Sequence, residues 1–168
     1  MKFGRFLMSV IYFIIIVSIA FWAYGRENTW KVFFGKADMG AVDFASLSPA
    51  KKTNNALFCP EDYCPKAERK SPSPIFDMSA ETLKDKLFNI INAEPHMQQV
   101  GNDDANHDYR FVQYTRLMRF PDTIRIKIID LGEDKSTLAI FSESQIGRND
   151  FSVNYKRING WMDILEGK

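Results

Sequence analysis

The chain has 168 residues and a nearly balanced charge, with 22 Lys and Arg against 21 Asp and Glu. This length allows one ordinary domain with an appendage and excludes two full domains. The net charge of +1 argues against a general nucleic-acid binder, which would carry a basic surplus. With 45% hydrophobic and 26% charged residues, the composition is that of a folded globular protein.

The first 25 residues differ in composition from the rest of the chain. From Phe6 to Tyr24 no residue is charged, and at about 1.5 Å per residue this run matches the roughly 30 Å hydrocarbon core of a bilayer. Lys2 and Arg5 precede the run and are expected to stay in the cytoplasm. We therefore expect residues 6–24 to contact the lipid bilayer as a single-pass helix of the inner (cytoplasmic) membrane, with the C-terminal domain in the periplasm.

A cleaved signal peptide is the alternative for residues 1–25. The tripeptides that begin at Ser18 and Ala23 loosely resemble the small-x-small site of a signal peptide. The bulky rings of Phe21 and Trp22 crowd these sites, and the apolar run is long for a signal peptide. Length therefore favours a retained transmembrane anchor, and either alternative exports the rest of the chain.

Residues 26–78 are expected to form an extended approach segment. A short, mostly aromatic group follows the expected span and consists of Trp30, Val32, Phe33 and Phe34. This aromatic group either lies in the membrane interface or packs onto the domain. Further along, the run Lys66–Pro74 is charged and then rich in Ser and Pro, which favours an extended connector.

Cys59 and Cys64 stand five residues apart, and a proline follows each of them. In an oxidising compartment this spacing predicts a disulfide that closes a small loop. A thioredoxin-like pair would need two intervening residues, and haem attachment would need a histidine where Pro65 stands. Zinc would need two further ligands, and the only histidines, His96 and His107, are far away in the sequence. We therefore expect a structural disulfide, no metal site and no cofactor.

Residues 79–168 carry the periodicity of an α+β domain. Ser79 is a good helix N-cap, and an apolar stripe with helical spacing follows it, consisting of Leu83, Leu87, Ile90 and Ile91. Alternating residues predict strands over 109–120, 123–129 and 137–143, with a shorter strand near 97–100. Turns are expected at 101–108 and at Pro121.

A last helix is expected from about Asp150 to Glu166, with Asp150 as its cap. Its apolar stripe consists of Phe151, Ile158, Trp161, Met162 and Leu165. Strands bounded by helices predict the α+β class, here a small antiparallel sheet of three to five strands packed against two helices.

One polar constellation joins the last expected strand to the last expected helix. Its side chains are Ser142, Ser144, Arg148, Asp150, Asn154 and Arg157. The strand and helix periods bring these side chains toward one corner of the domain. Because helix N-termini and arginines suit anions, one hypothesis is a ligand-binding pocket for a carboxylate or phosphate group. The alternative is that these groups satisfy one another and lock the helix to the strand.

Two stretches carry a family resemblance: Arg119–Arg125, which reads RFPDTIR, and Ser142–Arg157, which reads SESQIGRNDFSVNYKR. Together with the Cys-Pro, Tyr-Cys-Pro and Ser-Pro elements, they resemble the family called domain of unknown function 1499, over roughly Asp43 to Leu165. Glu143 and Ser152 stand where arginine and glycine are frequent in that pattern. The resemblance implies a bacterial, often membrane-associated protein, and it supplies no catalytic residue.

Two classes of function remain open. The first is a non-catalytic module that faces the periplasm and binds a protein, a small molecule or a lipid. The sequence has no phosphate-binding glycine loop, no G-x-S-x-G elbow and no His-Glu-x-x-His motif. The second is a hydrolase with Ser142 or Ser144 as nucleophile, assisted by Asp150 or Arg148. The first class is favoured, because neither histidine is linked to the junction as a base.

Overall fold

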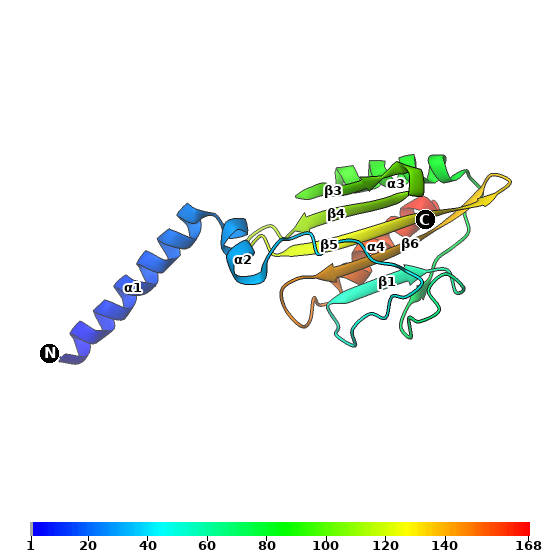
Figure 1. Cartoon of the computed structure of the whole chain (residues 1–168). Coiled ribbons are helices and arrows are strands. Elements are labelled where there is room, and N and C mark those ends of the chain that lie inside the picture. Colours follow the sequence, from blue (N-terminus) through cyan, green and yellow to red (C-terminus); the bar gives the residue numbers. More distant parts are fainter. Residues whose placement is uncertain (1) are drawn as a thin grey trace.

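A computed structural model of the chain describes residues 2–168, in which an isolated helix precedes a domain of sheet and helices (Figure 1). Helix α1 (Lys2–Tyr24) projects away from the domain and is not buried by it. Its length and composition suit a membrane span or a signal segment. Gly25 turns the chain with a φ of 97°, which glycine adopts without strain, and helix α2 (Arg26–Phe34) follows.

The domain is built on one sheet of six strands in the spatial order β2-β1-β6-β5-β4-β3. Its strands are β1 (Asn55–Cys59), β2 (Ser71–Pro72), β3 (Met97–Asp103), β4 (Asp108–Tyr114), β5 (Pro121–Gly132) and β6 (Lys135–Ser144). All neighbours pair antiparallel except β1 and β2, which pair parallel. The α+β class is confirmed. The sheet exceeds the predicted three to five strands because β1 and β2, from the expected approach segment, join it.

Several strand boundaries differ from the sequence prediction. Strand β4 ends at Tyr114 rather than at residue 120, because residues 115–120 form a loop in which Thr115 N–H donates to the Phe120 carbonyl at 3.0 Å. Pro121 is the first residue of β5 rather than a turn. Strand β3 runs on to Asp103 past a bulge, so only residues 104–106 form the turn, as a 3₁₀ helix η1.

Helices α3 (Ala80–Ala93) and α4 (Val153–Leu165) cover one face of the sheet (Figure 1). Ser79 caps α3 as predicted, since its hydroxyl accepts the N–H of Thr82 at 3.2 Å. The main core lies between these helices and the strands. Its fully or almost fully buried residues include Leu83, Leu87, Ile91, Ile124, Ile126, Leu138, Ile140, Ile158 and Trp161.

Helix α4 begins later than predicted. Phe151 and Ser152 have φ values of 53° and 64°, in the left-handed region, so the helix starts at Val153. Phe151 therefore lies outside the buried stripe and is 82% exposed, contrary to the prediction. Asp150 still stabilises the first turn of the helix, because its carboxylate accepts the N–H groups of Ser152 and Asn154 at 2.9 Å each.

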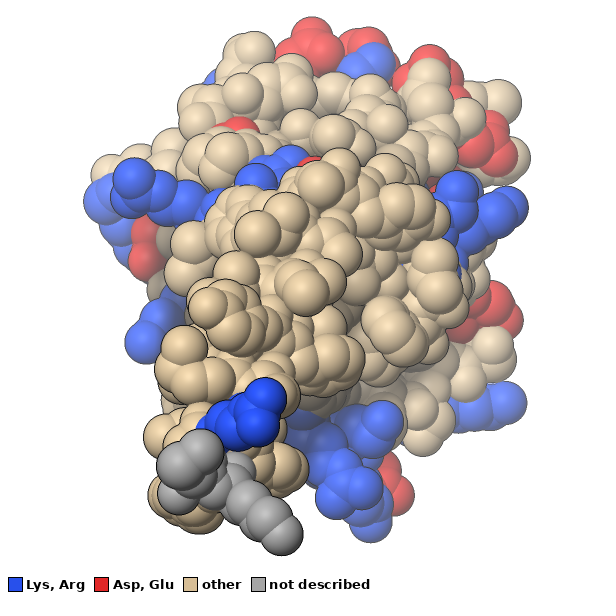
Figure 2. All heavy atoms as spheres, turned by 90° about the vertical axis from the view of Figure 1, so that its left-hand side faces the viewer, with Lys and Arg blue, Asp and Glu red and all other residues tan. Residues whose placement is uncertain are grey.

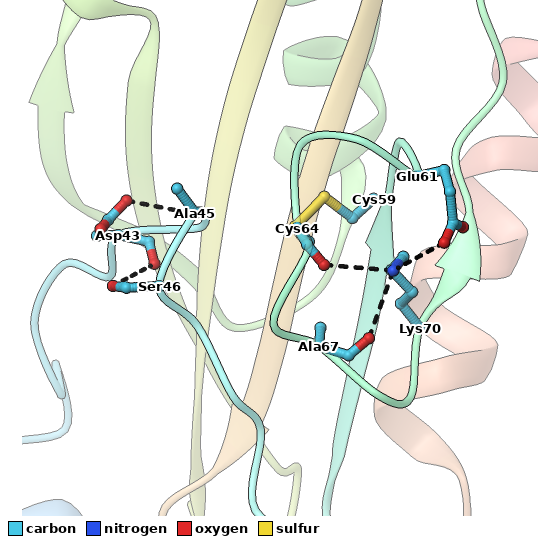
Figure 3. Close-up of a disulfide and its surroundings, with 8 residues drawn as sticks. All are labelled: Asp43, Ala45, Ser46, Cys59, Glu61, Cys64, Ala67 and Lys70. Atoms are coloured by element: carbon cyan, nitrogen blue, oxygen red, sulfur yellow. Dashed lines mark hydrogen bonds and ion pairs between the residues drawn. A yellow bond between two sulfur atoms is a disulfide. The ribbon is translucent and has the colours of Figure 1, made fainter.

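The opposite face of the sheet is covered by the chain between α2 and β2, which crosses it in Figure 1. Cys59 and Cys64 form the predicted disulfide, and both are completely buried. Figure 3 shows the loop that they close, where Lys70 Nζ donates to the carbonyls of Cys64 at 3.2 Å and Ala67 at 3.4 Å. A small second core forms here, from Phe44, Leu57, Cys59, Cys64, Ala67, Ala139 and Phe141.

Two arginines on this face hold the crossing segment. Arg110 donates to the two oxygens of Asp38 at 3.1 and 3.2 Å, and Arg125 Nε donates to the Gly40 carbonyl at 2.9 Å. Burial opposes the ionisation of Asp38, but hydrogen bonds from Arg110 and Gly40 outweigh it and lower the pKa of Asp38. Burial also lowers the pKa of Arg125, against the opposing effect of Glu143 at 3.4 Å.

Candidate functional site

The junction between β6 and α4 is organised around the amide of Asn154. Its Nδ2 donates to the carboxylate of Asp150 at 2.7 Å, to Ser144 Oγ at 3.0 Å and to the backbone carbonyl of Asn54 at 3.2 Å. Its Oδ1 accepts the hydroxyl of Ser142. Asn154 and Ser142 are completely buried, so these bonds replace those that water would otherwise make.

Arg157 completes the network one turn further along α4. Its Nη1 donates to Ser142 Oγ at 2.9 Å and to Asn154 Oδ1 at 2.7 Å. Its Nε donates to Gln113 Oε1 at 2.5 Å, and its Nη2 donates to the Asp122 carboxylate at 2.6 Å. The side chains of Arg157 and Asp122 are only 7% and 8% exposed. With its charge paired and nearly all its N–H groups used, this guanidinium has little capacity for an external anion.

Five of the six predicted site residues meet in this network, and Arg148 does not. The Arg148 side chain is exposed, and only its backbone carbonyl is engaged, by the Thr53 hydroxyl at 3.2 Å. Sequence reasoning missed Asn54, Gln113 and Asp122, which reach the junction from just before β1, from β4 and from β5, respectively. Asp122 lies within the RFPDTIR stretch, which was the one signal that pointed to it.

Neither serine of the junction contacts a base. The Ser142 proton points to an amide oxygen, and Ser144 Oγ accepts from an amide nitrogen. His96 directly precedes β3, so β4 and β5 stand between it and β6. The His107 carbonyl instead accepts the N–H of Ile128, which lies four residues along β5 from Ile124, the strand partner of Ser142. Three strand spacings of about 4.8 Å for His96, and four residues of about 3.4 Å each along β5 for His107, both amount to roughly 14 Å, beyond hydrogen-bond reach. Across residues 2–168, no group of three His, Cys, Asp or Glu side chains is placed to hold a metal ion.

A second candidate region lies where α2 meets the loop of residues 115–120. Backbone carbonyls of this loop accept from Arg26 and from Trp30 Nε1, the latter at 2.6 Å. Glu27 and Arg119 form an ion pair at 2.7 Å, and the Trp30 and Phe120 ring centroids are 4.9 Å apart. These contacts fix α2 against the domain although about 90 residues separate the two segments in the sequence.

The aromatic group that follows α1 divides between two environments. Trp30 packs onto the domain, which was one of the two alternatives for the whole group. Val32 and Phe33 instead remain 67% and 73% exposed, and Phe34 is half exposed. The outward side of α2 is therefore apolar, directly after the end of α1.

A cavity of about 230 Å³ opens between α2 and the domain. Because α2 directly follows α1, the expected membrane span, we call it the membrane-proximal cavity. Lys31, Lys36 and Arg119 line it with positive charge, whereas Glu27 supplies the negative charge. Burial raises the pKa of Tyr114, another lining residue, because it disfavours the phenolate. The Tyr114 phenol is therefore a neutral hydroxyl at physiological pH.

Gln145, which directly follows β6, connects the domain to the end of α2 at the membrane-proximal cavity. Its Nε2 donates to the carbonyls of Phe34 at 3.1 Å and Lys36 at 2.6 Å. These two acceptors fix the orientation of the amide, because the reverse orientation would place oxygen against oxygen. The Oε1 atom of Gln145 is buried and has no hydrogen-bond partner within residues 2–168.

The fold and the covalent structure define the class of protein. It is a single α+β domain behind an N-terminal apolar helix, with a disulfide that suggests an extracytoplasmic compartment. A family model described as a protein of unknown function, DUF1499, matches residues 46–165. The chain belongs to this DUF1499 family, and the match includes both the disulfide loop and the β6–α4 junction. A search of the curated proteins finds no match.

Proposed function

We propose that this protein is a single-pass protein of the inner membrane whose domain faces the periplasm and acts as a non-catalytic binding module. The ligand classes open to it are a small molecule, a lipid or a partner protein. The observation that carries the proposal is the bonding of Ser142 and Ser144. Both hydroxyls are engaged by the amide of Asn154, and among the described residues neither forms a hydrogen bond to a carboxylate or an imidazole.

The proposed placement rests on three features. The run from Phe6 to Tyr24 is long enough for a span, and Lys2 and Arg5 precede it on the side expected to stay in the cytoplasm. The Cys59–Cys64 disulfide suits an oxidising compartment. The exposed apolar side of α2 begins where the span ends, so it suits the interface between hydrocarbon and water.

In this proposal the β6–α4 junction has a structural role, which is to hold α4 on the sheet, and the ligand binds elsewhere. Its members pair with one another across four segments of the chain. Such a satisfied network fixes α4 on the sheet but offers few free donors. The membrane-proximal cavity has the opposite character, because Lys31 and Lys36 form no ion pair among the described residues.

Native mass spectrometry of the full chain, extracted from its own membrane, tests the proposal. We expect a bound non-protein mass, or a bound partner protein, on a substantial fraction of the molecules. A fluorophosphonate probe applied to the same preparation should leave the serines unlabelled. Covalent labelling that disappears in the Ser142→Ala or Ser144→Ala variant would instead establish the hydrolase alternative.

A further inference from the structure

We propose that the membrane-proximal cavity binds the phosphate-bearing headgroup of an anionic phospholipid from the bilayer that α1 enters. The inference rests on the proposed function, because it assigns a ligand class to the binding module. Helix α1 ends at Tyr24, and α2, which forms one wall of the cavity, begins at Arg26. When α1 spans the hydrocarbon core, this cavity therefore lies at the height of the lipid headgroups.

Charge is distributed unevenly along the domain. Residues 26–36 and 115–120 contain five Lys and Arg against one carboxylate, whereas the rest of the chain after residue 25 contains fifteen against twenty. Viewed from the side of α1, Lys and Arg side chains border the apolar surface of the helix (Figure 2). The end of the domain next to the bilayer is thus positive, which favours anionic lipid.

The cavity offers donors that suit phosphate oxygens. Lys31 and Lys36 have no carboxylate partner within the described chain, and Arg119 shares its charge with Glu27. An ammonium group donates up to three hydrogen bonds, and such bonds to phosphate are stronger than neutral ones. The Tyr114 hydroxyl adds a neutral donor. The set is cationic overall and matches a singly charged phosphodiester.

The acceptor on Gln145 and the apolar side of α2 point to a lipid rather than to free phosphate. Buried Oε1 would gain a partner from a hydroxyl of the headgroup, as in a glycerol phosphate, since unpaired buried acceptors are costly. Val32 and Phe33 lie on the same short helix and are exposed. Acyl chains attached to the bound phosphate would run along such a surface, whereas inorganic phosphate would leave it in water.

The test uses the full chain in nanodiscs that contain equal amounts of phosphatidylglycerol and phosphatidylcholine. Native mass spectrometry after release measures the fraction of protein that retains each lipid. We expect retention of one phosphatidylglycerol in preference to phosphatidylcholine. In the double variant K31Q/K36Q, the affinity for phosphatidylglycerol should fall by about tenfold, as expected for the loss of charge-assisted hydrogen bonds.

The matched control is K86Q/K156Q, which removes the same charge from exposed positions on α3 and α4. Its lipid retention should equal that of the unchanged chain, and inorganic phosphate added to the nanodiscs should not displace the lipid. Equal retention of both lipids, an unaffected K31Q/K36Q variant, or displacement by phosphate would each overturn the lipid assignment. A co-purified ligand that is not a lipid would also overturn it, while leaving the binding module intact.

Discussion

Arg157 and Asp122 pair at 2.6 Å with both side chains less than a tenth exposed. We expect Arg157→Met to lower the free energy of unfolding by about 3–5 kcal/mol, because it leaves the Asp122 carboxylate buried without its cation. Chemical denaturation of the full chain in detergent measures this change. The neighbouring exposed Lys156→Met is the control and should change stability by less than about 0.5 kcal/mol. A similar small effect at Arg157 would show that the pair is not buried.

Ser152 occupies a position where only glycine is free of backbone strain. Its φ is 64°, and its side chain makes no capping hydrogen bond to α4. The left-handed conformation costs a non-glycine residue about 1–2 kcal/mol, which exceeds the extra unfolded-state entropy of glycine. Ser152→Gly should therefore raise the free energy of unfolding by about 0.5 kcal/mol. Ser152→Ala, which keeps the strain, should give no gain, and a glycine variant no more stable than the alanine variant would contradict this account.

The Asp38–Arg110 pair makes part of the stability dependent on pH. Since the folded-state pKa of Asp38 lies below its ordinary value of 3.8, the pair contributes stability above that value and loses it as the pH falls through the folded pKa. Asp38→Asn should cost about 1 kcal/mol at pH 7. Urea denaturation at pH 7 and below pH 4 should show this difference shrinking in acid. A constant difference across the range would exclude a folded-state pKa shift.

Among the elements, the disulfide loop beside β1 contributes to the second core. The closed loop is short, with a sequence separation of five. For a loop of this size, chain entropy gives about 2 kcal/mol. We expect the double variant Cys59→Ala/Cys64→Ala to unfold with about that loss while α3 and α4 keep their helical circular dichroism. A loss of all helical signal would show that the loop supports the whole sheet rather than its β1 side.

The elements that could be predicted from sequence have local signals. Helix α3 has a capping serine and a helical apolar stripe, and β5 alternates isoleucines that pack under the helices with polar residues on its other face. Strand β1 was not predicted because Ala56–Cys59 are buried on both faces of the sheet and do not alternate. The start of α4 was misplaced because Phe151 continues the apolar spacing while its backbone is not helical.

The candidate sites show the same division between local and long-range information. The run from Ser142 to Arg157 predicted that six polar side chains would meet, because strand and helix periods act over a few residues. Five of them do, and Arg148 does not. The partners of these five, Asn54, Gln113 and Asp122, depend on strand pairing, which the sequence alone does not specify. The membrane-proximal cavity was not predicted at all, since it forms only where α2 docks on a loop about 90 residues away.

At the scale of the whole molecule, α1, the joint at Gly25 and the docked α2 define how the domain is oriented relative to the proposed membrane span. The positive end of the domain lies next to α1, and the β5–β6 hairpin points away from it (Figure 1). Opposite charge between lipid and domain would hold this orientation at low salt and weaken as salt screens it. The proposed function requires the domain to lie on the periplasmic side.

The most direct test of that requirement is labelling with a membrane-impermeant maleimide. Lys135→Cys places one thiol on the exposed β5–β6 hairpin, while Cys59 and Cys64 remain paired and unreactive. Phe3→Cys places a thiol at the opposite end of α1 as the control. With the outer membrane permeabilised and the inner membrane intact, we predict labelling of Lys135→Cys and no labelling of Phe3→Cys until lysis. Labelling of Lys135→Cys only after lysis would contradict a periplasmic domain.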